Sequence, residues 1–180
     1  MDIRSTTVAR IAMLSALVVV LDYAMKFSGF KIPFPWLPFL KFDFTGIPIM
    51  LSFLLIDLNA GAFTSAVAFF AILVRSGKAV ESSMKALAEF STVLGFYLGS
   101  RILKGKPNLS GVLSYILGCV TRILVMFVLT IPVFTLYYGM PLNVVLAISP
   151  MVAIFNLLHG FLSIFGGNLL YEALKRRGVI

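Results

Sequence analysis

Residues 110–137 read SGVLSYILGCVTRILVMFVLTIPVFTLY, and Arg122 is the one charged side chain in this stretch. A helix needs about 20 predominantly apolar residues to cross the hydrocarbon core of a bilayer. The stretch is long enough to cross a membrane with some tilt. It therefore predicts that the chain is an integral membrane protein.

The composition of the whole chain agrees with this prediction. Of its 180 residues, 60% are hydrophobic and 12% are charged, and the mean hydropathy is +1.03. That charged share is about half of what soluble domains carry, which is too little to cover a single core with polar surface. The composition argues against a soluble enzyme, a nucleic-acid binder and a disulfide-stapled secreted module. A single cysteine, Cys119, and a single histidine also argue against an internal zinc site.

Six apolar runs, joined by short turns, predict six transmembrane helices in one domain that covers residues 1–180. The runs are Thr6–Phe27, a stretch from after Asp43 to about Leu58, Ala60–Arg75, Val80–Leu103, Ser110–Tyr137 and Val144–Leu174. Asp43 or Thr45 is a plausible N-cap of the second helix, because short polar side chains accept hydrogen bonds from free helix N–H groups. The basic start of the first run is also typical of a signal peptide, but no clear small-residue cleavage site follows it. The expected fold class is an all-α, multi-pass membrane protein.

The segment between the first two runs has a different composition. Gly29–Phe42 reads GFKIPFPWLPFLKF and contains three prolines among aromatic residues. Each proline lacks a backbone donor and restricts the residue before it, so this segment cannot form a regular helix. An apolar, aromatic loop of this kind belongs at the membrane interface or over the protein as a lid.

Basic residues predict how the helices cross the membrane. Six spans put both termini on one side, which carries Arg4, Arg10, Arg101, Lys104, Lys106, Lys175, Arg176 and Arg177. The opposite side carries Lys26, Lys31, Lys41, Arg75 and Lys78, with Lys85 nearby. Because cytoplasmic loops are enriched in Lys and Arg, we expect both termini in the cytoplasm and Gly29–Phe42 outside.

Polar side chains inside apolar runs are costly and usually have a function. Asn156 and His159 lie three residues apart, so they share one face of the sixth predicted helix. Both can donate and accept hydrogen bonds, as a heterocycle with carbonyls and ring nitrogens would require; hydrogen bonding between helices is the alternative. Arg122 lies too deep to reach the head groups freely, and we predict a structural ion pair for it. Glu89 is either a ligand contact or a residue solvated at a helix end.

Small residues at helical spacing form a second pattern. Ala9, Ala12 and Ala16 line one stripe of the first predicted helix, and Gly95 and Gly99 form a GxxxG pair in the fourth. Small side chains let helices approach closely, either inside a fold or between subunits. The sequence shows no nucleophile motif, phosphate-binding loop or metal-ligand cluster, so we expect no catalytic or metal-binding residues.

The stretch PFLKFDFTGIP, residues 38–48, resembles the loop and second-helix start of the riboflavin-specific S components of energy-coupling factor (ECF) vitamin transporters. Those proteins read roughly P-F-L-K-x-D-F-S-x-I-P there. IAMLSAL, residues 11–17, is similar to the Ala-x-x-x-Ala motif of that family's first helix. Glu89-Phe90 with Gly95 resembles its E-F-x-N-x-x-x-G motif, and FNLLH, residues 155–159, resembles its F-N-x-x-K motif. This chain departs from the family at His159, which replaces a Lys, at Thr92, which replaces an Asn, and at Thr130, which aligns with a fifth-helix Asn.

The resemblance implies a high-affinity riboflavin-binding subunit, for which riboflavin is a transported substrate and no cofactor is expected. It implies a binding site that contains Leu40, Lys41, Phe42, Asp43, Glu89, Thr92, Thr130, Asn156 and His159. It also implies that the alanine stripe docks onto a transmembrane coupling subunit, which works in the cell membrane with two cytoplasmic ATPases. The departures leave a related flavin or another vitamin as an alternative substrate. From another class, the alternative is a non-transport membrane assembly protein of similar size.

Overall fold

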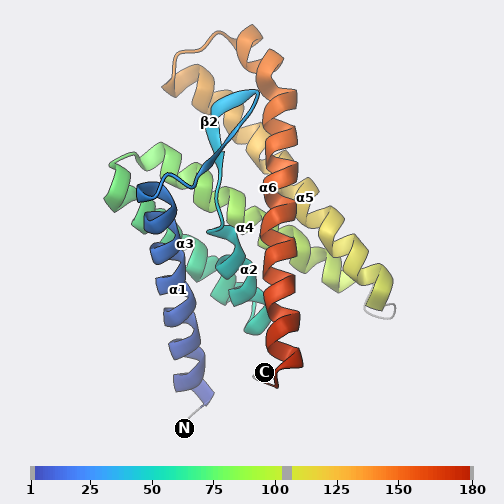
Figure 1. Cartoon of the computed structure of the whole chain (residues 1–180). Helices are drawn as coiled ribbons and strands as arrows, with labels where there is room; N and C mark the ends of the chain where they lie inside the picture. Colours follow the sequence, from blue (N-terminus) through green and yellow to red (C-terminus); the bar gives the residue numbers. More distant parts are fainter. Residues whose placement is uncertain (1–2, 103–106, 179–180) are drawn as a thin grey trace.

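The computed structural model describes residues 3–102 and 107–178, which form a bundle of helices with a short hairpin at one end (Figure 1). The elements are α1 (Ile3–Phe27), β1 (Ile32–Phe34), β2 (Leu37–Phe42), α2 (Gly46–Leu55), α3 (Leu58–Ser76), α4 (Ala79–Ile102), α5 (Pro107–Pro132), the π-helical turn η1 (Val133–Tyr137) and α6 (Leu142–Arg176). Lys104 and Lys106 of the charge count lie outside the described residues, as does Leu103 at the predicted end of the fourth run.

The described residues form six α-helices, which differ in their capacity to cross a membrane. Helices α1, α3, α5 and α6 are long and apolar enough to span one. Helix α2 has 10 residues, and at about 1.5 Å per residue it reaches half of a hydrocarbon core about 30 Å thick. Helix α4 is long, but its first half carries Glu81, Lys85 and Glu89. The described part of the chain therefore holds four candidate spans, and the predicted count of six spans is not confirmed.

Helix α2 is shorter than its apolar run for a local reason. It ends at Leu55, and the Asp57 carboxylate caps the next helix by accepting from the Ala60 N–H at 2.8 Å. Thr45 occupies the N-cap position of α2 but makes no side-chain cap hydrogen bond, because its hydroxyl donates to Asp43 Oδ1 at 2.6 Å. Of the two predicted N-cap residues, Thr45 is therefore confirmed in position, without the expected side-chain hydrogen bond.

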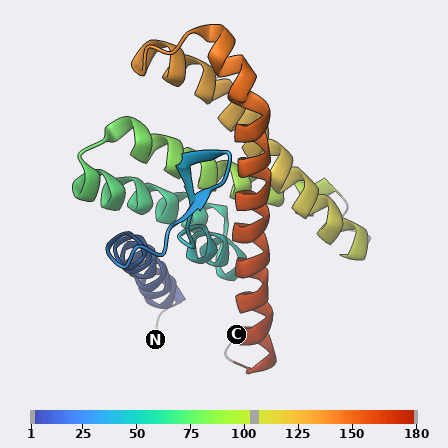
Figure 2. The same ribbon diagram turned by 45° about the horizontal axis from the view of Figure 1, so that its top comes forward.

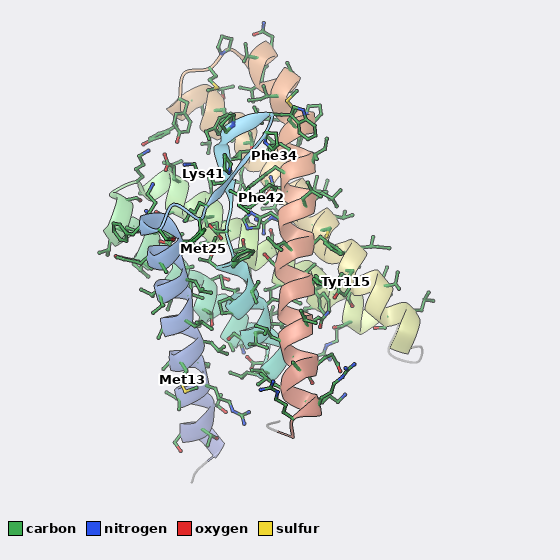
Figure 3. All side chains as sticks on the ribbon, viewed as in Figure 1. Met13, Met25, Phe34, Lys41, Phe42 and Tyr115 are labelled. Carbon is green, nitrogen blue, oxygen red and sulfur yellow. The ribbon has the colours of Figure 1, made fainter. Side chains whose placement is uncertain are left out.

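The Pro-aromatic segment forms an antiparallel hairpin, which corrects the prediction of an all-α chain with a loop at this place. In the hairpin Ile32 lies opposite Phe42, and Phe34 lies opposite Leu37. The Phe34 ring is buried, with its centroid 5.6 Å from that of Phe155 in α6 and 5.9 Å from that of Phe42. Figure 3 shows Phe34 and Phe42 between the hairpin and α6. Because an isolated two-stranded hairpin is at best marginally stable in water, this packing on α6 is what stabilises it.

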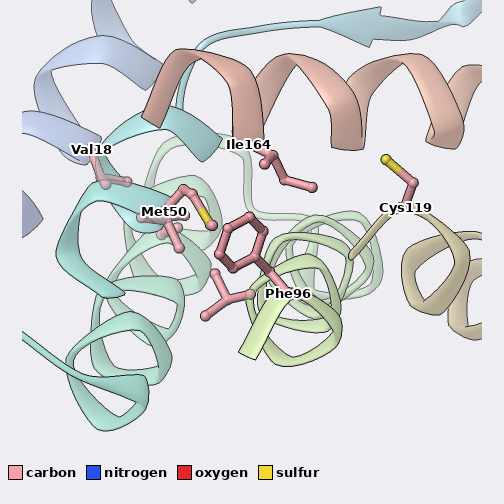
Figure 4. Close-up of a cluster of buried hydrophobic side chains, with 8 residues drawn as sticks. Val18, Met50, Phe96, Cys119 and Ile164 are labelled. Atoms are coloured by element: carbon pink, nitrogen blue, oxygen red, sulfur yellow. The ribbon is translucent and has the colours of Figure 1, made fainter. Parts of the chain in front are cut away.

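A core of apolar side chains joins the helices beneath the hairpin. Val18 of α1, Met50 of α2, Phe96 of α4, Cys119 of α5 and Ile164 of α6 are buried together there (Figure 4). With Ala68 of α3, this cluster draws side chains from all six described α-helices, and it fixes the positions of the elements that surround the site described below.

Two glycines bring α4 and α5 into close contact. A Cβ atom at Gly95 would collide with the carbonyl oxygen of Leu117, and one at Gly99 would collide with the backbone of Ser114. Interiors are packed too densely to absorb such overlaps without backbone movement. The GxxxG pair thus serves packing inside this fold.

The two ends of the bundle differ in what they carry. Figures 1 and 2 both show that α1 begins and α6 ends at one end of the molecule, whereas the hairpin and the turn between α5 and α6 lie at the other. Helix α6, with 35 residues, runs between the two ends. Which end faces the cytoplasm remains a prediction from the charge count.

Candidate functional site

A cavity of about 640 Å³ lies at the hairpin end of the molecule. Its walls come from β2, the first half of α4, the second half of α5, η1 and α6, with contributions from the last turns of α1 and α3. Apolar side chains such as Phe39, Met84, Met126 and Phe155 form much of the lining. Sites for small molecules are cavities of about 300–1,000 Å³ with mostly apolar walls and a few placed polar groups. The cavity has the size and lining of such a site.

Lys85 of α4 is the centre of the polar part of the cavity. Its Nζ atom lies 2.8 Å from Asp43 Oδ1, 2.9 Å from Glu89 Oε1 and 3.2 Å from His159 Nε2. An ammonium group has three donors and no acceptor, so it can donate to all three neighbours at once. Lys85 thereby joins the exit of the hairpin to α4 and α6.

Two neighbours share the Nε2 atom of His159. The Lys85 ammonium and the Asp43 carbonyl oxygen each lie 3.2 Å from it, so Nε2 accepts from Lys85 in one tautomer of the neutral ring and donates to Asp43 in the other. His159 Nδ1 is buried and has no hydrogen-bond partner among the described residues. A residue of the cavity wall thus carries an unpaired ring nitrogen, and a buried polar group without a partner costs about 1–3 kcal/mol.

Arg122, which lines the cavity, forms an ion pair with Glu89, which lies behind the lining. Arg122 Nη1 lies 3.1 Å from Glu89 Oε1, and both side chains are buried. The guanidinium also donates to Thr92 Oγ1 at 3.1 Å and to Asn156 Oδ1 at 3.2 Å, and Ser163 donates to Glu89 Oε2 at 3.0 Å. The structural ion pair predicted for Arg122 is confirmed. Glu89 belongs to this buried cluster, and its interpretation as a residue solvated at a helix end is wrong.

Asn156 lies on the cavity wall with both ends of its amide in use. Its oxygen accepts from Arg122, and its Nδ2 donates to the Val152 carbonyl oxygen at 2.9 Å. The hydrogen bond between helices that the sequence analysis gave as an alternative is therefore present. Asn156 and His159 do share a face of α6, as their spacing predicts, and both line the cavity.

A second ionic group lies on the α1 side of the cavity. Asp22 is completely buried and accepts from Lys31 Nζ at 2.6 Å and from Arg75 Nε at 2.6 Å. Lys31 also lies 3.5 Å from Asp43 Oδ2. The sequence analysis missed Asp22, although a carboxylate inside an apolar run was a signal of a buried partner.

Asp43 links the two ionic groups at the point where the hairpin leads into α2. Burial acts to raise the pKa of a carboxyl group, but the charges of Lys85 and Lys31 hold the pKa of Asp43 well below its usual range. Asp43 is therefore ionised at neutral pH. It ties the end of β2 electrostatically to α4 and to the residues that follow α1.

The residues predicted to bind a ligand come together here from distant parts of the chain. Those that line the cavity are Leu40, Lys41, Asp43, Thr130, Asn156 and His159. The others stand behind the lining: the Phe42 ring packs against Phe155 with centroids 4.8 Å apart, and Glu89 and Thr92 contact Arg122. The cavity also includes residues that the sequence analysis had used only for topology, such as Lys26 and Arg75.

The alanine stripe lies away from the cavity. Ala9, Ala12 and Ala16 are all exposed on α1. Their helix runs from the hairpin end toward the end where α6 terminates (Figure 1). The stripe is therefore not packed inside the described fold, and its role stays a prediction.

Comparison with solved structures finds the same arrangement of elements in a known protein. A structure described as "Structure and mechanism of the S component of a bacterial ECF transporter" matches with a TM-score of 0.78 and 27% sequence identity, over 96% of this chain and 97% of that one. This chain has the fold of an ECF-transporter S component. No model of a protein family matches the chain, and no curated protein sequence matches it.

The S-component fold narrows the class of function. The matched protein is described as the S component of a transporter, and nearly the whole length of both chains takes part in the match. Together with the four candidate spans, the match supports a membrane protein with a transport role. The match does not identify the substrate or the partner subunits of this chain.

Proposed function

We propose that this chain is the riboflavin-binding S component of an ECF-type transporter. The observation that carries the proposal is that PFLKFDFTGIP and the Asn156–His159 pair meet at one cavity. These are two of the stretches that resemble riboflavin-specific S components. The S-component fold supports the transport class independently of these motifs.

The chemistry of the cavity suits a flavin. The isoalloxazine ring is flat and largely apolar, and Phe39, Leu40 and Met84 provide apolar wall for it. Its carbonyl oxygens and ring nitrogens accept hydrogen bonds and its N3–H donates one, and His159 Nδ1 is a buried ring nitrogen that has no partner among the described residues. The ribityl hydroxyls need polar partners, which Thr130 and the polar end of the cavity supply.

In this proposal, transport needs partner subunits that bind and hydrolyse ATP. The sequence shows no phosphate-binding loop, so in this proposal two cytoplasmic ATPases supply the energy and a transmembrane coupling subunit transmits it. The exposed stripe of Ala9, Ala12 and Ala16 is the proposed docking surface for the coupling subunit. The chain would sit as a multi-pass protein in the cell membrane, capture riboflavin outside and deliver it inward.

The absorption spectrum of the purified protein tests the proposal. A protein that retains riboflavin is yellow and shows the flavin bands, and the ligand-free protein quenches riboflavin fluorescence with a one-to-one endpoint. A colourless protein that binds riboflavin no better than a mixture of unrelated vitamins would reject the riboflavin assignment. If another vitamin competes in that mixture, the chain is an S component for that vitamin, whereas binding of none of them favours a membrane assembly protein.

A further inference from the structure

A second layer of polar side chains lies directly behind the polar lining of the cavity. Lys85 and Glu89 are one turn apart on α4, and His159 and Ser163 are one turn apart on α6. The first member of each pair lines the cavity, as does Asp43. The second members are buried behind the lining and bond to each other, with Ser163 Oγ donating to Glu89 Oε2 at 3.0 Å. The second layer therefore supports the first.

Gly46, the first residue of α2, packs against this second layer. A Cβ atom there would collide with Ser163 Oγ and with Glu89 Oε2, and it would lie 2.8 Å from Glu89 Cδ. The backbone conformation does not require glycine here, because Gly46 is not among the glycines with a positive φ angle. Helix propensity also disfavours glycine relative to alanine. What this position requires is space for its neighbours.

The two neighbours of Gly46 differ in their freedom to move. The Ser163 hydroxyl can rotate and donate to a carbonyl oxygen of its own helix, as other serines of α4 and α6 do. The Glu89 carboxylate is held in place, since its Oε1 atom lies 2.9 Å from Lys85 Nζ and 3.1 Å from Arg122 Nη1. A methyl group at position 46 would therefore act mainly by displacing this carboxylate.

Displacement of the Glu89 carboxylate would reach the cavity through its two cationic partners. Lys85 and Arg122 both line the cavity, and Arg122 also donates to the lining residue Asn156 at 3.2 Å. Hydrogen bonds weaken steeply when their geometry is lost, so both cations would have to follow the carboxylate. Because the polar groups of a binding site must be held to within about 0.5 Å, such a shift would lower the affinity for a ligand.

We propose that Gly46 is a positioning residue of the ligand site: by carrying no side chain, it leaves the Glu89 carboxylate in the place from which it fixes Lys85 and Arg122 on the cavity wall. The inference rests on the proposed function, because it assigns a role in the same site to a residue that does not line the cavity. Gly46 differs in this from Gly99, whose missing side chain makes room for the backbone of α5.

The riboflavin affinity of Gly46→Ala tests the inference. The full-length protein is purified in detergent, and the dissociation constant of its monodisperse fraction is measured from the quenching of riboflavin fluorescence. We expect Gly46→Ala to bind riboflavin about fivefold more weakly or worse, which is the cost of one lost hydrogen bond to a desolvated ligand.

Gly99→Ala is the matched control. Its added Cβ would collide with the backbone of Ser114, and Gly99 does not line the cavity. This variant should unfold at a lower denaturant concentration and keep the dissociation constant of the parent. If Gly46→Ala loses no affinity, or loses only as much as Gly99→Ala does, position 46 serves packing alone and the inference is overturned.

A second substitution shows whether Gly46 acts through the carboxylate. Glu89→Asp keeps the charge and withdraws the carboxylate by one methylene group, which makes room for a methyl group at position 46. In the Glu89→Asp background, Gly46→Ala should therefore weaken binding by less than about twofold, so that the two changes are not additive. If Gly46→Ala weakens binding by the same factor in both backgrounds, it does not act through Glu89 and the inference is wrong.

The same pair of substitutions decides the case in which Gly46→Ala does not fold. Recovery of a monodisperse protein that binds riboflavin when Glu89→Asp is added supports the inference. A double variant that stays unfolded overturns it.

The outcomes also distinguish the inference from the proposed function. A parent protein that binds no riboflavin rejects the proposed function. A parent protein that binds riboflavin, together with a Gly46→Ala variant that binds it equally well, overturns the inference alone.

Discussion

The hairpin end of the molecule and the contact between α4 and α5 are held together by different interactions. At the hairpin end, Asp43, Lys85 and Glu89 connect β2, α4 and α6 through short charged contacts. Between α4 and α5, Gly95 and Gly99 let the two backbones approach closely, at Leu117 and Ser114. The first region is charged and surrounds a cavity, and the second is uncharged and closely packed.

The difference shows where function and stability lie in this fold. Buried charges at the cavity are costly to desolvate and would be replaced at little loss by apolar residues if stability were their purpose. Close glycine contacts gain dispersion energy and provide nothing for a ligand. Substitutions in the first region should therefore alter both binding and stability, and those in the second should alter stability alone.

The largest effect is expected from breaking the buried ion pair. Arg122→Met leaves Glu89 without its guanidinium partner in a buried site and should lower the free energy of unfolding by about 3–5 kcal/mol. A denaturant titration in detergent measures it. Lys78→Met is the control, since its pair with Glu81 is exposed and exposed pairs contribute little. Equal, small losses for both variants would show that the buried cluster does not stabilise the hairpin end.

A smaller loss of stability is expected between α4 and α5. Gly95→Leu forces a side chain against Leu117 and should lower the free energy of unfolding by about 1–3 kcal/mol. Gly111→Leu, where an added Cβ meets open space, should be tolerated. The folded fraction of Gly95→Leu should still bind riboflavin as the parent does. Loss of binding in that fraction would mean that the two regions are not separable.

Removing the Asn156 amide should affect binding. Asn156→Leu leaves Arg122 without an acceptor and removes a polar group from the cavity wall, so riboflavin affinity should fall by about 1–3 kcal/mol, roughly five- to 150-fold. Asn168→Leu is the matched control on the same helix, because Asn168 bonds to Tyr115 and does not line the cavity. If Asn156→Leu and His159→Leu both bind riboflavin like the parent, α6 does not form the site.

The smallest effect on the purified protein is expected at the alanine stripe. Ala12→Trp and Ala16→Trp change exposed positions away from the cavity, so folding and riboflavin binding should be preserved. Uptake in cells and co-purification with the coupling subunit should fall sharply, because a large side chain separates the helices. A variant that both binds riboflavin and transports it normally would show that the stripe is not the docking surface.

The long helices could be predicted from the sequence because apolar runs of sufficient length have few alternatives in a membrane protein. The second run was predicted to extend to about Leu58, but α2 ends at Leu55 and Asp57 caps α3. The hairpin was missed because its strands are short and rich in proline. It forms through the packing of Phe34 on α6, which no local pattern reveals.

In the site too, features with a local sequence pattern could be predicted, and contacts between distant residues could not. Asn156 and His159 were found because residues three apart share a helix face. The partnership of Asp43 with Lys85 spans 42 residues, and that of Asp22 with Arg75 spans 53, so neither has a local signature. The basic residues used to predict orientation gave no sign that they converge on one cavity, because that convergence depends on how five helices and a hairpin pack.

Ligand protection tests most directly whether flavin occupies the cavity at the hairpin end. Cys119 is replaced by alanine, and single cysteines are placed at Lys41, on the cavity lining, and at Ala12, on the exposed stripe. A water-soluble maleimide then reports the labelling rate of each with and without saturating riboflavin. The account predicts that riboflavin slows labelling at position 41 and leaves position 12 unchanged. Unchanged labelling at position 41 in the presence of bound riboflavin would contradict it.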